Sequence, residues 1–88
     1  MYLIKIGHMD GQTPLLCSQD KNKLEKLMPS IVSTIKILNE PNNIYNLSWT
    51  EKASFIRQRC SFLTEEEIQS FINSNPNYAR IIQCRELL

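Results

Sequence analysis

Two stretches in the second half of the chain match the capping box that begins an α-helix. Ser48 is followed by Glu51 and Thr64 by Glu67, so each hydroxyl and each carboxylate can satisfy a backbone N–H of the first turn. The run of three glutamates that begins at Glu65 suits the positive end of a helix dipole, which explains it better than a metal site does. These boxes predict two short helices, beginning near residues 49 and 65.

The first residues of the chain indicate a β-hairpin. Residues 2–7 are β-branched and aromatic and partly alternate between two faces, as in a strand. The pair Asp10-Gly11 is a strong turn signal, and Pro14 suits the first residue of a second strand. The hairpin is therefore expected to be completed by residues 14–18.

A longer helix is predicted from about residue 20. Either Ser18 or Asp20 can cap it. Its apolar stripe is formed by Leu24, Leu27, Met28, Ile31, Ile35 and Leu38. Pro29 should kink or divide the helix, because proline lacks the N–H and its ring meets the preceding turn. Residues 31–38 are β-branched enough to form a strand instead, and this alternative stays open.

The C-terminal segment admits two interpretations. Pro76 ends the preceding helix, and residues 78–87 then form either a strand or a last short helix capped by Asn75. The strand is preferred because a two-stranded hairpin is marginal by itself. The sequence thus predicts a single α+β domain over residues 1–88, in which the N-terminal hairpin and a C-terminal strand form a small antiparallel sheet covered by about three helices.

Composition narrows the classes of function. The chain has 88 residues and a net charge of +1, from 10 basic and 9 acidic side chains, which is far from the basic excess of a dedicated nucleic-acid binder. No nucleotide-binding or hydrolase motif occurs, and two glycines cannot build a phosphate-cradling loop. We expect a protein without enzymatic activity, cofactor or metal. The three cysteines, in no paired spacing, are typical of reduced thiols, and we expect a cytoplasmic protein that neither enters nor spans a membrane.

The single histidine and the cysteines offer the alternative of an enzyme or zinc protein. His8 could activate the thiol of Cys17 if the two lay across the hairpin from one another. His8 with Cys17, Cys60 and Cys84 would also complete a Cys3His zinc shell. None of the four has the spacing of a usual zinc site, and buried cysteines with a surface histidine are the simpler interpretation.

One surface of the helix from residue 49 combines an aromatic side chain with cations. The stripe expected to face the core is formed by Trp49, Ala53, Ile56 and Cys60. Lys52, Phe55 and Arg59 lie beside it at i, i+3 and i+7, and Arg57 lies at its far edge. Aromatic and arginine side chains are enriched at the centres of protein interfaces. The sequence predicts a partner-binding site of these four residues, which could also contact a nucleic-acid backbone.

The competing interpretation is that Phe55 belongs to the core, either beneath the helix from Thr64 or beneath the segment 39–46. A second route to interaction is strand addition at an open edge, formed by residues 14–18 or by residues 78–87. The charges of Arg80, Arg85 and Glu86 would restrain such pairing. Because so small a core gains stability from association, we expect a homodimer.

The overall composition is similar to that of many small accessory proteins of phages and mobile elements, which are short, rich in Ile, Asn and Lys and poor in Ala and Gly. This general resemblance implies a protein that binds and blocks another macromolecule. The expectation is a non-enzymatic protein-binding module, an inhibitor or regulator. A nucleic-acid-associated factor using the basic helix 49–60 is the alternative.

Overall fold

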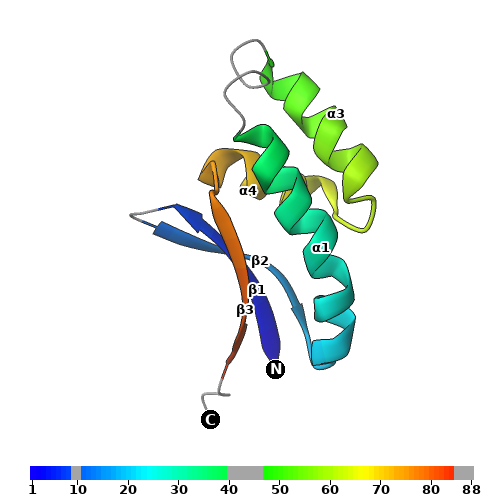
Figure 1. The fold of residues 1–88 in the computed structure, drawn as a ribbon, viewed down its shortest axis with the longest axis vertical. Helices are drawn as coiled ribbons and strands as arrows, with labels where there is room; N and C mark the ends of the chain where they lie inside the picture. Colours follow the sequence, from blue (N-terminus) through cyan, green and yellow to red (C-terminus); the bar gives the residue numbers. More distant parts are fainter. Residues whose placement is uncertain (9–10, 40–46, 85–88) are drawn as a thin grey trace.

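The computed structural model describes residues 1–8, 11–39 and 47–84. It shows a three-stranded antiparallel sheet with three helices on one side of it (Figure 1). Along the chain the elements are β1, β2, α1, α3, α4 and β3. The predicted α+β fold, a hairpin and a C-terminal strand covered by helices, is confirmed.

The sheet is built around its first strand. β1 (Tyr2–His8) pairs with β2 (Gly11–Ser18) on one side and with β3 (Tyr78–Gln83) on the other, both antiparallel. Ile4 and Ile6 of β1 have no exposed surface, because the central strand lies directly under the helices. The predicted turn residue Asp10 lies outside the described residues, but its neighbour Gly11 pairs with His8 across the hairpin.

The second strand begins earlier than predicted and is irregular. It starts at Gly11 rather than at Pro14, which pairs with Lys5 inside the strand. Ile4 pairs with Leu16, so Leu15 has no counterpart and forms a β-bulge. Proline is tolerated here because β2 is an edge strand, where a missing N–H breaks no ladder bond.

The long helix α1 (Lys21–Leu38) is continuous through Pro29. Asp20 caps it by accepting from the N–H groups of Asn22 and Lys23 at 3.0 and 3.4 Å. The exposed position of Pro29 lets the helix pass without burying the carbonyl that has lost its partner. The strand alternative for residues 31–38 is wrong, because the helical spacing of buried Leu24, Ile31 and Ile35 outweighs β propensity.

Both predicted capping boxes are present. They begin α3 (Trp49–Arg59) at Ser48 and α4 (Glu65–Ser74) at Thr64. α4 ends at Asn75, whose left-handed backbone (φ 45°) turns the chain toward Pro76 and β3. The strand interpretation of the C-terminal segment is thereby confirmed over the helical one.

The core lies between the sheet and the helices. Its largest fully buried side chains come from every layer: Phe71, Ile4, Ile6, Leu24, Ile31, Ile56 and Ile68. α1 and α4 contact the sheet directly, whereas α3 rests on α1 and α4 and contacts no described strand (Figure 1). No helix within the described ranges has the length and apolar character needed to cross a membrane.

Candidate functional site

The predicted site belongs to α3, the helix farthest from the sheet. Ala53, Ile56 and Cys60 of this helix are buried against the rest of the molecule, as predicted. Trp49 was predicted to join them but is 47% exposed. Trp49 is the first residue of α3, and its indole remains at the surface although it shares the face of the buried residues.

Phe55 is half-buried and faces α1 rather than α4. Together with Ile37 and Leu38 of α1 and with Leu47, it lines an open apolar depression. The interpretation that places Phe55 beneath α4 is not what the structure shows, and most of the segment 39–46 lies outside the described residues. Phe55 therefore fills part of the gap between two helices and leaves part of its ring at the surface.

Arg59 lies beside this depression, next to Phe55. Its guanidinium lies over the Phe55 ring, 5.5 Å from the ring centroid, in a cation–π arrangement. Its Nη2 also donates a hydrogen bond to Oγ of Ser33 on α1. The cation predicted to face a partner is thus oriented by α1 and keeps Phe55 in place, while the arginine itself remains exposed.

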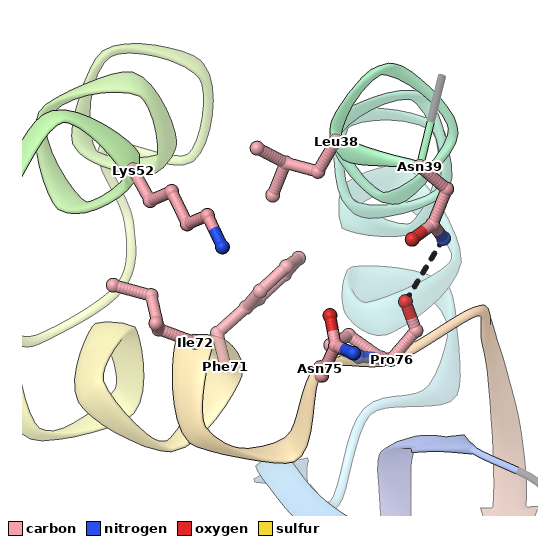
Figure 2. Close-up of a pocket in the computed structure, with 7 residues that line it drawn as sticks. All are labelled: Leu38, Asn39, Lys52, Phe71, Ile72, Asn75 and Pro76. Carbon is pink, nitrogen blue, oxygen red and sulfur yellow. Dashed lines mark hydrogen bonds between the residues drawn. The ribbon is translucent and has the colours of Figure 1, made fainter. Parts of the chain in front are cut away.

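Lys52 lies on the other side of Leu38. Its ammonium points toward a small pocket between α1 and α4 that is lined by apolar side chains of Leu38, Phe71 and Ile72, with Asn75 at the floor (Figure 2). The opposite wall is closed by Asn39, whose amide donates to the carbonyl of Pro76 at 3.0 Å. No acidic partner for Lys52 is found among residues 1–8, 11–39 and 47–84.

Arg57 is separated from the other three residues by its ion pair. Its Nε and Nη2 donate to both carboxylate oxygens of Glu65 at 2.9 and 2.8 Å, which joins the C-terminal half of α3 to the N-terminus of α4. Hydrogen bonding to Arg57 lowers the pKa of Glu65, and the same bonds raise the pKa of Arg57. The structure therefore brings Phe55 and Arg59 together, directs the ammonium of Lys52 toward the neighbouring pocket, and gives Arg57 an intramolecular partner.

Replacing Arg57 with glutamine should raise the pKa of Glu65 back toward that of an ordinary glutamate. In the folded protein that pKa is depressed, so the stabilisation from the pair is present above the ordinary carboxyl pKa and is lost as the pH falls through the lowered value. NMR titration of the Glu65 carboxyl in both proteins measures this. An unchanged Glu65 pKa in the Arg57→Gln protein would contradict the role of the pair.

The structure separates the histidine from the cysteines. His8 pairs with Gly11 at the turn end of the hairpin, whereas Cys17 pairs with Leu3 near the opposite end. Five residues of extended strand separate these positions by roughly 16 Å, so His8 cannot activate the Cys17 thiol in this arrangement. Cys60 is in the core, where burial raises the pKa of its thiol.

The predicted zinc ligands are also not brought together in the structure. Across the described ranges, no three potential ligands among His, Cys, Asp and Glu come together. Cys60 instead packs against Thr34, whose Oγ1 lies 3.5 Å from its sulfur and donates to the carbonyl of Ser30 at 2.7 Å.

Sequence reasoning missed the contribution of α1 to this surface. The neighbours of Phe55 and Arg59 include three residues of α1, namely Ser33, Ile37 and Leu38. A helical wheel of α3 cannot show these neighbours, because it contains only residues of α3. An available signal was Ile37, which lies off the buried stripe of α1 and is still apolar.

Comparison with known proteins does not assign this chain to a family. No protein-family model, curated protein or solved structure matches the chain.

Proposed function

We propose that this chain is a protein-binding module without enzymatic activity of its own, which acts as an inhibitor or regulator by covering a surface of its partner. The surface concerned, called here the α1–α3 surface, comprises Ile37, Leu38, Lys52, Phe55 and Arg59. The observation that carries the proposal is the open apolar depression at Phe55, with the Arg59 guanidinium held over the Phe55 ring. Apolar centres rimmed by oriented cations are favourable places for a partner's side chains.

The two cations differ in what they offer a partner. Arg59 is already oriented by Ser33 and by the Phe55 ring, so little side-chain entropy remains to be lost when it binds. Lys52 has a half-buried stem and points its ammonium toward an apolar pocket. A partner that suits this surface would place an apolar side chain against Phe55 and a carboxylate near the Lys52 ammonium.

The proposal extends to the compartment. Cys17, Cys60 and Cys84 are all free thiols, which persist in a reducing cytoplasm, and we place the protein there. The nucleic-acid alternative needs Lys52, Arg57 and Arg59 together. Since Arg57 is paired with Glu65, this alternative has less positive charge available than the sequence suggested.

Phe55→Ala and Lys52→Glu, made separately, are expected to weaken partner capture by at least about tenfold each, the effect of losing an interface hot spot. The measurement is affinity capture from host lysate with nuclease treatment and high-salt washes, followed by titration of the recovered protein. Lys23→Glu, the same charge change on an exposed part of α1, is the matched control and should bind normally.

Full binding by both folded variants would show that the α1–α3 surface is not the site. Recovery of nuclease-sensitive material alone, lost as salt is raised, would replace the protein-binding proposal with nucleic-acid binding.

A further inference from the structure

The two edges of the described sheet differ in their ability to accept another strand. On the β2 edge, Pro14 lacks an N–H and Leu15 forms a bulge, and both features discourage pairing. From Tyr78 to Gln83, β3 contains no proline and keeps a regular register with β1. β3 is therefore the edge that is suited to pairing.

The backbone groups that face outward on β3 can be identified from its ladder. Cys84 donates its N–H to the carbonyl of Met1 at 2.8 Å. Because hydrogen-bonded and non-hydrogen-bonded pairs alternate along an antiparallel ladder, the bonds to β1 come from Tyr78, Arg80 and Ile82. The N–H and C=O groups of the alternate residues, Ala79, Ile81 and Gln83, point away from β1.

An apolar groove runs between this edge and α1. Val32, Ile35 and Ala79 contribute its apolar lining, and Lys36 and Asn39 contribute polar atoms. Val32 is 46% exposed and adds apolar surface to this groove. A strand added to β3 would extend the sheet and cover this groove at the same time.

We propose that a second copy of this chain occupies the β3 edge, with the two β3 strands antiparallel across a two-fold axis at Ile81. Ala79 of each copy then pairs with Gln83 of the other, and Arg80 pairs with Ile82 of the other. The two three-stranded sheets become one continuous sheet of six strands. The groove that the second copy would cover shares no lining residue with the α1–α3 surface.

Charge and strand register favour a two-fold axis at Ile81 over an axis one residue earlier or later. A two-fold axis at Arg80 would set two guanidinium groups directly opposite each other, which destabilises a strand pair. An axis at Ile82 would leave Ala79 without a described partner. The axis at Ile81 uses every outward-facing backbone group of the strand and places Arg80 beside an apolar residue.

Side chains on the helix-facing side also fit a second copy. Ile4 and Ile81 are directly opposite in the ladder, so the axis at Ile81 continues this apolar row into the other copy. Gln83 of the second copy falls beside Ala79 on the same side of the sheet. Its aliphatic part can cover Val32 while its amide reaches the polar groups of the groove.

The first test is sedimentation equilibrium of the purified full chain. We expect a dimer for the wild type, at least about tenfold weaker association for Ala79→Pro, and wild-type behaviour for Ala79→Ser. Proline removes the outward N–H of residue 79, which bonds the second copy, whereas serine keeps it. A wild-type chain that stays monomeric, or a folded Ala79→Pro protein that dimerises fully, overturns the proposal.

The second test reads the register directly and does not depend on the folding of the proline variant. In a Cys17→Ser, Cys84→Ser background, Arg80→Cys combined with Ile82→Cys should form disulfide-linked dimers on mild oxidation. The two positions form a non-hydrogen-bonded pair, whose Cα atoms lie about 4.5 Å apart, within disulfide reach. Arg80→Cys alone should not crosslink. Efficient crosslinking of that single variant, or none in the double variant, rejects the axis at Ile81.

Discussion

Replacing Phe71 with alanine is expected to lower the free energy of unfolding by about 3–5 kcal/mol. Phe71 has no exposed surface and is among the largest of the fully buried side chains, on the helix α4 that packs against β1, β2 and α3. Truncation removes its transfer free energy and leaves a cavity that the rigid sheet cannot fill. Since the total free energy of unfolding of a small domain is only about 5–15 kcal/mol, the variant should unfold at modest urea concentrations.

Phe55→Ala is the matched control for this experiment, because the chemical change is identical. Phe55 is half-buried beside an open depression, so its removal exposes surface to water rather than creating a closed cavity. Its cost should be less than half that of Phe71→Ala, measured by urea denaturation followed by circular dichroism. Equal costs for the two variants would mean that Phe55 is a core residue, which would also weaken its assignment to a binding surface.

Replacing Gly7 with alanine should be the second most damaging change, with a loss of about 1–3 kcal/mol from overpacking. Gly7 is buried in the central strand and pairs with Tyr78. A Cβ at this position would lie 2.6 Å from Oη of Tyr78 and 2.7 Å from the carbonyl oxygen of Gly11. The tyrosine can rotate aside, but the carbonyl belongs to the adjacent strand, so the hairpin itself must shift.

Gly11→Ala provides the control, since a Cβ there has no neighbour within 4 Å. Its effect on the free energy of unfolding should stay within about 0.5 kcal/mol. Adding Tyr78→Ala to the Gly7→Ala protein should recover only part of the loss, because the clash with Gly11 remains. A thermal or urea transition unchanged by Gly7→Ala would show that the strand has room for a side chain.

The fold could be predicted because its signals are local. The capping boxes at Ser48 and Thr64, the alternation in residues 2–7 and the helical stripe of α1 each depend on neighbouring residues. The open choice for residues 31–38 was decided by tertiary burial, which propensity cannot supply. The start of β2 was misplaced because an edge strand accepts Pro14 inside it, and sequence does not say which strand lies at the edge.

The candidate site was harder to predict because it depends on contacts between helices. The helical wheel placed Lys52, Phe55 and Arg59 on one side of α3; in the structure Arg59 lies over the Phe55 ring, while Lys52 lines the neighbouring pocket. It could not show that Arg57 would form an ion pair with Glu65, because the spacing of α3 and α4 sets the distance between the two side chains. Trp49 lies on the buried face by angle and is still exposed, since an angular pattern does not say where the packed neighbours stop.

The position of β1 between its two neighbours has a consequence for synthesis. β2 follows β1 almost at once, but β3 reaches it only after α1, α3 and α4 have been made (Figure 1). During translation the central strand therefore keeps one side unpaired until residues 78–83 leave the ribosome. A nascent chain that stops before β3 presents the unpaired backbone edge of β1 to chaperones and proteases. The sheet that makes the protein stable also requires nearly the whole described chain to be present before folding can be completed.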